Sequence, residues 1–454
     1  MPNPQPINIT QRAMRIEAVQ PSKRESKSPF YIVLLYILLE FGRPQDIIPG
    51  LGVLRLSMLT SLAIGFSLLF SGKVNIGNIQ TKCFLAILAL MVIHGPFAVN
   101  NYHALLTFQV MALTFIGYLG IICFVDSISK IRTLACLWLG VHLLLAIIGI
   151  IKGGVGVGGF FGDENDVAME LNMVIPFAFF GIFSASNTFK KSTYIGLLCA
   201  YIAAVLATLS RGGFIGLSAV GAFCWAQSSR KFLSAILVFL LVAFILVAAP
   251  EKYWKEIGSI TSDQTMEQGT GGERLYTWGI SWEMFLANPI MGVGQGNFQW
   301  VFPDYEQGRT FNTKSLGGRA AHSAYFTLLP ELGLIGTSLF LGMLYFTRRD
   351  LKFVYKLCRL DNGKAGKGEQ KSDELKKVYF LARAMECSFV GYLVSSIFVS
   401  TLYYPSCWIM MAFVVTLRNS ALALDSDPLK AASAPIRNLS SRLGSVSYPG
   451  SRVR

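Results

Sequence analysis

Apolar runs of membrane-spanning length recur along this chain and constrain its fold more than any other feature. An α-helix crosses the hydrocarbon core of a bilayer with about 20 apolar residues. Segments of that size occupy most of the sequence between residues 30 and 423. Only 15% of the residues are charged, compared with roughly 25% in soluble domains. We therefore predict an all-α, polytopic membrane protein.

The apolar runs divide the chain into about 12 predicted transmembrane spans. Their ranges are 30–49, 53–71, 82–99, 103–125, 131–151, 168–186, 192–210, 212–228, 231–249, 322–346, 378–400 and 405–423. Polar residues such as Arg43 and Pro44 interrupt the first span, which is the weakest. The basic tail 1–29 has no apolar core, so we do not expect it to be a cleavable signal peptide. The tail 424–454, rich in Ser, Ala, Pro and Arg, is expected to be disordered.

The distribution of Lys and Arg predicts the orientation of the spans. With the N-terminus in the cytoplasm, the inner segments hold 30 of the 40 Lys and Arg residues. Because cytoplasmic loops collect these residues, we expect both termini and the basic loop 347–377 in the cytoplasm. Loop 250–321, after the first nine spans (30–249), then lies in the periplasm, where ATP is absent and a substrate must arrive already activated. The same topology explains the net charge of +14 without nucleic-acid binding.

Two arginines on this predicted outer face suit an anionic ligand. Arg211 stands in "ATLSRGGFIGLS" at a tight turn between spans, where a planar guanidinium at headgroup depth can bind phosphate. An ordinary interfacial anchor is the alternative reading of Arg211. Arg274 stands in the first turn of an amphipathic helix predicted over 272–287, on the membrane surface. A cation there opposes the helix dipole, which favours an anion nearby.

Two glycine-rich segments resemble ligand-binding motifs only in part. The glycines of "GVGQGNF" (292–298) have the spacing of a dinucleotide loop, but no strand precedes them, so we predict a tight turn. The segment "GGVGVGGFFGDENDVAMELN" ends in Asp163, Glu164 and Asp166. These acids lack the ligand spacing of a calcium loop and have no histidine beside them. We expect them to be structural or acceptor-positioning rather than metal ligands.

The segment "RAAHSAYFTLLPELGLIGTSLF" places an ionisable ring at the mouth of a predicted span. His322 has a near-neutral pKa by default and can act as an acid or a base. Glu331 lies nine residues further on, about 13 Å along a straight helix and on its opposite face. It therefore cannot be the partner of His322, although Pro330 is a potential kink. Small residues follow, so we expect Glu331 to hydrogen-bond across a close helix–helix contact.

Five segments together carry a family resemblance. They are "AHSAYFTLLPELGLIGTSLF", "SRGG", "GGERLYTW", "NPIMGVGQGNF" and "GDENDVAME". The first resembles the signature of the bacterial O-antigen ligase and O-antigen polymerase superfamily, a periplasmic histidine followed by a helix with Glu-x-Gly-x-x-Gly. The others are similar to weaker motifs of that family, over roughly residues 150–420. Ser323 stands where the family usually has Asn.

This resemblance implies an integral membrane glycosyltransferase of the bacterial inner membrane. Members move a glycan from an undecaprenyl-diphosphate carrier to an acceptor hydroxyl, with no metal or other cofactor. The resemblance implies that His322 is the catalytic base and that Arg211 and Arg274 bind the diphosphate of the lipid-linked donor. Asp163 and Asp166 are candidates for positioning the glycan or lipid acceptor. Membrane lipid is the remaining expected partner, and no nucleic acid is expected.

Two other functions stay open at this point. A polymerase of the same superfamily joins two lipid-linked glycans and needs two carrier sites, and the sequence separates it poorly from a ligase. A transporter with about 12 spans is the alternative from a different class. Transporters of that size are commonly built from matching halves. This chain shows no such symmetry, which favours the enzyme.

Overall fold

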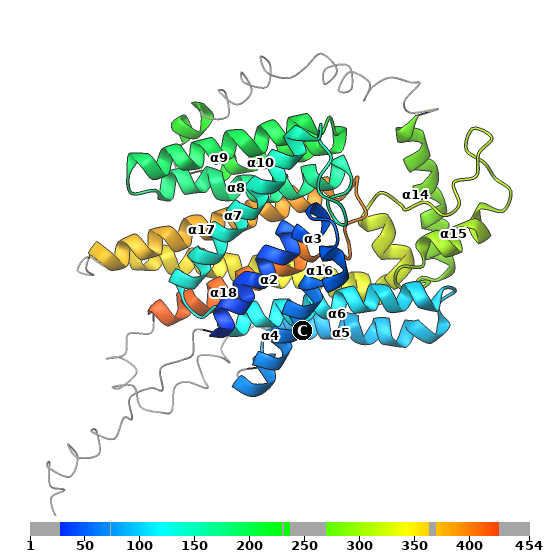
Figure 1. Cartoon of the computed structure of the whole chain (residues 1–454), viewed down its shortest axis with the longest axis horizontal. Coiled ribbons are helices and arrows are strands. Elements are labelled where there is room, and N and C mark those ends of the chain that lie inside the picture. Colours follow the sequence, from blue (N-terminus) through cyan, green and yellow to red (C-terminus); the bar gives the residue numbers. More distant parts are fainter. Residues whose placement is uncertain (1–27, 73, 229–230, 237–268, 363–368, 426–454) are drawn as a thin grey trace, which may run out of the picture.

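The computed structural model describes residues 28–72, 74–228, 231–236, 269–362 and 369–425. The regular secondary structure of these residues is helical, loops connect the helices, and the β-type pairings among them are two isolated bridges. The predicted all-α class is confirmed (Figure 1). Most of the predicted span 231–249, the segment 250–268 and nearly all of both tails lie outside the described residues.

Eight described helices are long and apolar enough to cross a membrane. They are α4 (Leu56–Ser71, extended by the short helix η1, Leu51–Leu54), α5 (Ile79–His94), α6 (Asn101–Phe124), α7 (Ile128–Ile151), α8 (Glu164–Ser184), α9 (Thr188–Ala207), α16 (Tyr325–Asn362) and α18 (Pro405–Asp425). Three further predicted spans coincide with α2 (Ser28–Gly42), α10 (Arg211–Gln227) and α17 (Glu369–Ser395). The prediction of a helical, multi-span membrane protein is confirmed, whereas the count of 12 is not.

The first predicted span, 30–49, is not a single helix. Helix α2 ends at Gly42, and Arg43, with φ 44°, leads into the short helix α3 (Pro44–Ile47). Proline has no N–H to donate and cannot continue α2. Arg43 pairs with Asp46 and lies 5.1 Å from the ring centroid of Phe160. The polar residues that weaken this span therefore tie the end of α2 to the glycine-rich segment before α8.

Helix α8 is the most enclosed of the candidate spans, since 89% of its 18-residue apolar stretch is buried inside the protein. It packs closely against α10 and α17 because small residues line the contact. A Cβ at Gly391 would lie 2.6 Å from the carbonyl oxygen of Asn172. The Asn172 amide donates to the Gly213 carbonyl at 3.0 Å and to the Ser395 hydroxyl at 3.1 Å. These contacts fix the helix ends that carry the candidate site.

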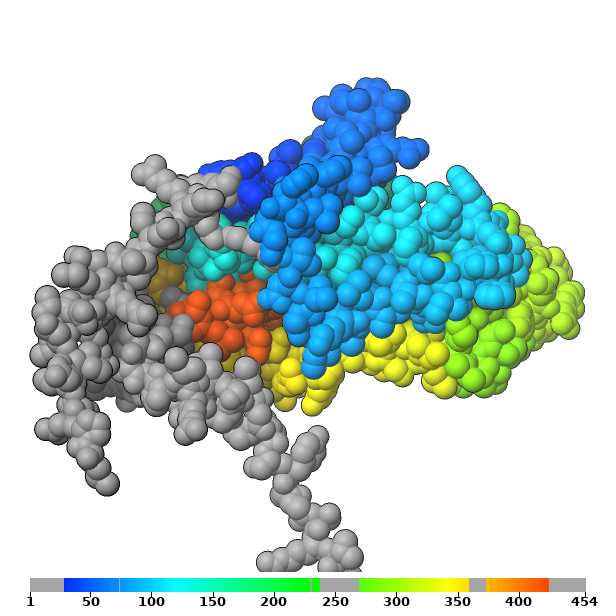
Figure 2. All heavy atoms as spheres, turned by 90° about the horizontal axis from the view of Figure 1, so that it is seen from below, coloured from blue at the N-terminus to red at the C-terminus, as the bar shows by residue number. Residues whose placement is uncertain are grey.

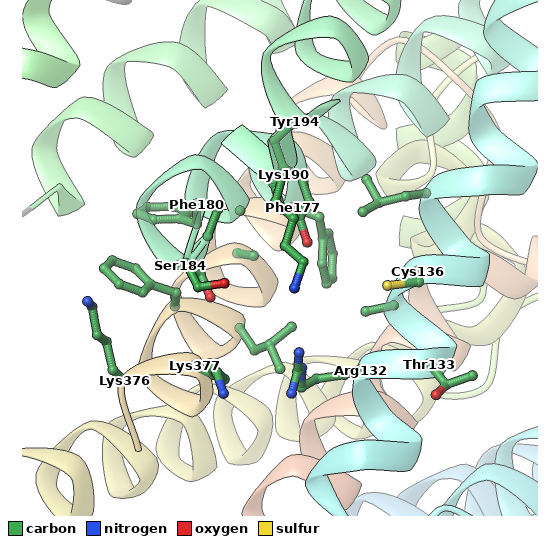
Figure 3. Close-up of a pocket in the computed structure, with 18 of the residues that line it drawn as sticks. Arg132, Thr133, Cys136, Phe177, Phe180, Ser184, Lys190, Tyr194, Lys376 and Lys377 are labelled. Atoms are coloured by element: carbon green, nitrogen blue, oxygen red, sulfur yellow. The ribbon is translucent and has the colours of Figure 1, made fainter. Parts of the chain in front are cut away.

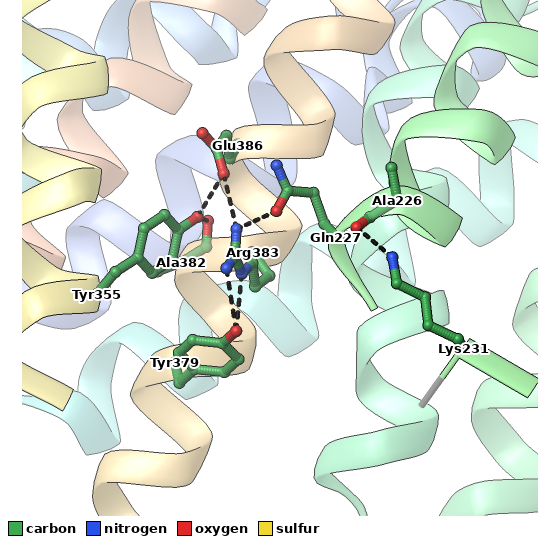
Figure 4. Close-up of polar contacts among 8 residues, drawn as sticks. All are labelled: Ala226, Gln227, Lys231, Tyr355, Tyr379, Ala382, Arg383 and Glu386. Atoms are coloured by element: carbon green, nitrogen blue, oxygen red, sulfur yellow. Dashed lines mark hydrogen bonds and ion pairs between the residues drawn. The ribbon is translucent and has the colours of Figure 1, made fainter. Parts of the chain in front are cut away.

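A buried arginine joins α10, α16 and α17 at the other end of these helices (Figure 4). Arg383 is 8% exposed and donates to the Tyr379 hydroxyl at 3.0 and 3.1 Å and to Gln227. Its guanidinium lies 4.2 Å from the ring centroid of Tyr355, and Glu386 at 3.4 Å supplies the opposite charge. Because a buried charge is costly unless it is paired and hydrogen-bonded, we assign Arg383 a structural role.

Helix α16 is interrupted at Gly333, which has φ 60° and ψ −162°. The segment 289–294 packs into the break, where a Cβ at Gly333 would lie 2.5 Å from the Ile290 carbonyl oxygen. The Val293 and Gly294 amides donate to the carbonyls of residues 330 and 331 at 2.8 and 3.0 Å, and two amides of α16 donate back to the segment. Irregular backbone at membrane depth requires such internal partners. The tight turn predicted for 292–298 is confirmed, since its three glycines have positive φ.

Glu331 has a different partner from the one predicted. Its carboxylate accepts hydrogen bonds from the amides of Gly296 at 2.7 Å and Phe298 at 2.9 Å, and from the Tyr403 hydroxyl at 2.5 Å. The prediction of a contact between two helices was wrong, because the glycine turn brings backbone donors to the carboxylate. Glu331 thereby fixes the segment that leads from helix α14 (Thr270–Ala287) to helix α15 (Phe298–Glu306).

We expect Glu331→Ala to lower the free energy of unfolding by about 3 kcal/mol, since two amides lose their acceptor inside the protein. Tyr403→Phe removes one donor and leaves the carboxylate with two, so it is expected to cost about 1 kcal/mol. Thermal unfolding of both variants in the same detergent measures the difference. Equal stability of Glu331→Ala and the parent chain would contradict this role.

Candidate functional site

A cavity of about 190 Å³ brings three segments together at the predicted outer end of the bundle. Its lining residues are Glu164, Asn165, Thr270, Glu273, Arg274, Thr277, Leu316, Arg319, Ala320, Ala321 and His322. The segments are the start of α8, the helix α14 (Thr270–Ala287) and the loop before α16. Two views place α14 and the following helix α15 (Phe298–Glu306) at one end of the molecule (Figures 1 and 2).

Helix α14 presents one face to the protein and leaves apolar side chains on another. Ile280 and Met284 are buried in a small core shared with α15 and with the loop before His322. Leu275, Trp282 and Leu286 are 51%, 47% and 58% exposed. The amphipathic helix predicted over 272–287 is confirmed. An exposed apolar stripe of this kind suits contact with lipid.

The backbone holds His322 in an unusual conformation. Its φ is 47°, in the left-handed region, which costs an L-residue roughly 1–2 kcal/mol. Hydrogen bonds on either side hold it there: Trp278 Nε1 donates to the Ala321 carbonyl at 2.9 Å, and the Ala324 amide donates to the Ser396 carbonyl at 2.9 Å. Strain that the surroundings enforce is typical of functional positions.

His322 does not cap the helix that follows it. The Thr327 amide donates to the Ser323 carbonyl at 3.0 Å, and the Ser323 hydroxyl lies 3.5 Å from the Phe326 amide. Within the described part of the chain, neither ring nitrogen of His322 makes a hydrogen bond. Both nitrogens are therefore free to meet a ligand at the cavity.

The surroundings favour the neutral form of His322. His322 is exposed to solvent, but the atoms around its ring remove part of its hydration. This burial lowers the pKa of His322, and the positive charge of Arg274 lowers it further. Because desolvation and a like charge both disfavour the imidazolium, the ring is neutral near pH 7 and can accept a proton.

Arg274 and Arg211 converge on the same end of the bundle. Arg211 is the first residue of α10, and it donates to the Thr270 hydroxyl at 2.6 Å, at the start of α14. The tight turn predicted around Arg211 is confirmed, since α9 ends four residues earlier. Burial and then the charge of Arg211 lower the pKa of Arg274. The charge of Arg211 thus disfavours the charged form of Arg274, and an anion bound beside Arg274 would offset this repulsion.

Of the three acids predicted to be structural or acceptor-positioning, Glu164 lines the cavity, whereas Asp163 and Asp166 do not. Asp163 caps α8, and its Oδ1 accepts from the Asn165 amide and side chain, both at 2.7 Å. Its negative charge partly offsets the lowering of the pKa of His322 and of Arg274. Asp166 is 6% exposed and lies beside Tyr404, whose pKa is raised by burial and by this carboxylate. In the described residues no group of three or more His, Cys, Asp and Glu is placed to hold a metal ion.

Sequence reasoning missed a charged pair at the cavity. Arg319 and Glu273 both line it and form an ion pair at 2.9 Å. The available signal was the closeness of each residue to a predicted site residue. Glu273 directly precedes Arg274, and Arg319 stands three residues before His322. Thr277, one helical turn after Glu273, lines the cavity as well.

Comparison with known proteins supports the resemblance seen in the sequence. Residues 195–341 match the family model described as O-Antigen ligase. The matched segment includes Arg211, Arg274 and His322, and so all the residues to which the resemblance gives a catalytic or donor-binding role. No match was found among curated proteins.

Proposed function

We propose that this chain is a membrane glycosyltransferase. The premise of this proposal is the match of residues 195–341 to the O-antigen ligase family. The chain transfers a glycan from an undecaprenyl-diphosphate carrier to an acceptor hydroxyl at the periplasmic face of the inner membrane. One observation carries the proposal above the others. A neutral histidine with unpartnered ring nitrogens lines the same cavity as Arg274, and Arg211 stands beside it.

In the proposed reaction His322 takes the proton of the acceptor hydroxyl as its oxygen attacks the anomeric carbon of the donor glycan. The bond from that carbon to the diphosphate oxygen breaks, and undecaprenyl diphosphate leaves with the electron pair. Arg274 and Arg211 stabilise the charge that develops on the leaving oxygen, an effect that preorganised cations supply well. His322 then releases its proton to water.

The exposed face of α14 supports a lipid-linked donor. Leu275, Trp282 and Leu286 lie on the helix that carries Arg274, so apolar contact and diphosphate binding come from a single element. A headgroup bound by Arg274 would keep its polyprenyl chain against these side chains. The cavity of about 190 Å³ is too small for an entire oligosaccharide. We therefore infer that it holds the reacting end of the donor while the remaining sugars extend into solvent.

In vitro transfer tests this function. The purified chain, supplied with an undecaprenyl-diphosphate glycan and an acceptor, is expected to give one glycan per acceptor and free undecaprenyl diphosphate, in excess EDTA as well as without it. Donor supplied alone is expected to remain unchanged. Longer lipid-linked glycans from donor alone would instead mean a polymerase, and activity lost in EDTA and restored by a divalent ion would contradict metal independence.

Cysteine labelling tests the proposed orientation. Lys314→Cys lies in the loop before His322, and Lys352→Cys lies in the basic segment 347–377, toward the opposite end of α16; both side chains are exposed. A membrane-impermeant thiol reagent is expected to label position 314 in intact cells and position 352 only after lysis, relative to the parent chain. The reverse pattern would place the cavity in the cytoplasm and exclude the reaction proposed here.

A further inference from the structure

A second and larger cavity lies at the end of the bundle opposite His322. Its volume is about 730 Å³ (Figure 3). Its walls come from the start of α7, the end of α8, the start of α9 and α17. The His322 cavity lies at the other end of these helices, at the start of α8. The donor and acceptor sites proposed above leave this second cavity without a role.

Cations outnumber carboxylates around this second cavity. Four basic side chains line it: Arg132, Lys190, Lys376 and Lys377. The acids beside them are Asp373, which lines it, and Glu374, which pairs with Lys377 at 2.8 Å and with Arg132 at 3.8 Å. Neither Lys190 nor Lys376 forms an ion pair with any described residue. Among the described residues, this leaves an excess of two positive charges around the cavity.

Two of these cations face each other across the space. Figure 3 shows the Lys190 ammonium and the Arg132 guanidinium directed toward one another from different walls. Like charges repel, and each keeps better hydration when turned away. The arrangement in which the two cations face each other becomes favourable when one anion, such as a phosphate, binds both of them.

The deeper wall of the cavity is aromatic and aliphatic. Phe177, Phe180, Phe380 and Leu139 line it together with Tyr194. The cations stand near the ends of three candidate spans, α7, α8 and α9, where a membrane helix meets the headgroup layer. A cationic mouth above an apolar wall at this depth matches an amphiphile, and a free phosphate would leave the apolar wall uncovered.

We propose that this cavity binds an anionic phospholipid, with its phosphate between Lys190 and Arg132 and an acyl chain against the aromatic wall. Basic pockets between membrane helices bind such headgroups. The occupant bridges α7, α8, α9 and α17, so it acts on the packing of the helices and takes no part in glycan transfer. This proposal does not depend on the proposed function.

Lipid binding to the purified full chain tests the proposal. Native mass spectrometry from detergent compares phosphatidylglycerol with phosphatidylcholine, and phosphatidylglycerol is expected to bind more tightly. Lys190→Ala is expected to weaken phosphatidylglycerol binding about fivefold, and the double variant Arg132→Ala, Lys190→Ala about 25-fold. Lys190→Arg keeps the charge and is expected to keep the binding.

Lys191→Ala is the matched control, since Lys191 is the adjacent basic residue but does not line the cavity. It is expected to bind phosphatidylglycerol like the parent chain. Equal losses in Lys190→Ala and Lys191→Ala would overturn the site. Competition by glycerol 1-phosphate or inorganic phosphate at the concentrations at which phosphatidylglycerol binds would also overturn it, because the acyl chain would then contribute nothing.

Discussion

Replacing His322 with alanine is expected to slow glycan transfer by about 10²–10⁴ while lipid-diphosphate binding stays nearly unchanged. The imidazole is the only titratable group in the cavity that is neutral near pH 7, has a free nitrogen and can accept the acceptor's proton. The carboxylate of Glu273 is engaged with Arg319, and Glu164 belongs to the first turn of α8. The measurement is initial transfer rate and donor affinity for each variant at matched membrane expression.

The positive φ of His322 provides a control that separates chemistry from folding. Glycine adopts φ 47° without a steric penalty, so His322→Gly is expected to fold at least as well as the parent chain. It should nevertheless lose transfer to the same extent as His322→Ala. Ser323→Ala removes the neighbouring hydroxyl and leaves the imidazole, so it is expected to keep most of the activity. A His322→Ala protein with near-normal transfer would remove the histidine from the mechanism.

Much of the helical framework could be predicted because apolar periodicity and length are local properties of the sequence. Arg211 was placed at a tight turn because the spans on either side leave no room for a longer loop. The amphipathic helix 272–287 was visible because its aromatic residues recur at helical spacing. The C-terminal boundary of the first predicted span was wrong. Hydropathy predicts a span to residue 49, but the helix ends at Gly42, before Pro44.

The partners of polar residues could not be predicted from spacing, because they come from distant segments. Glu331 was placed away from His322 by helix geometry, but its acceptor role depends on a glycine turn more than 30 residues earlier in the chain. The neighbours of Asp166 in the sequence predict a site residue, whereas in the structure its carboxylate lies beside Tyr404. The pair of Arg319 and Glu273 was missed for the same reason, since 46 residues separate its members.

The clustering of basic residues around the second cavity could not be predicted from the sequence either. In the sequence, Arg132, Lys190 and Lys377 are distinguishable only as members of the 30 basic residues that predict orientation, because cytoplasmic ends of spans collect such residues. The fold gathers them around an aromatic wall from helices far apart in the sequence. Residues that set topology can therefore also form a binding site, and only their arrangement in space distinguishes the two roles.

Arg274→Ala and Arg211→Ala are each expected to weaken donor binding roughly 10- to 150-fold, as well as turnover. That range corresponds to about 1.5–3 kcal/mol for a hydrogen bond to a charged group. Lysine at either position should recover only part of the loss, because an ammonium cannot reproduce the planar fork that binds two phosphate oxygens. Arg309→Ala is the control: Arg309 lies between α15 and α16, but it pairs with Glu283 at 2.7 Å and does not line the cavity.

The pH dependence of transfer separates Arg274 from Arg211. The pKa of His322 is lowered first by burial and then by Arg274, so the parent chain should keep its neutral base below pH 6.5 and lose rate only as the pH falls further. Arg274→Ala removes the charge that disfavours the imidazolium, so the acid limb of its rate profile is expected to move to higher pH. Arg211 lowers the pKa of Arg274, but it is not among the charges that act most strongly on His322, so Arg211→Ala should leave that limb in place. If the acid limb moves equally in both variants, both arginines influence the pKa of the histidine, and the distinction drawn here is wrong. If donor affinity is unchanged in both variants, the diphosphate binds elsewhere.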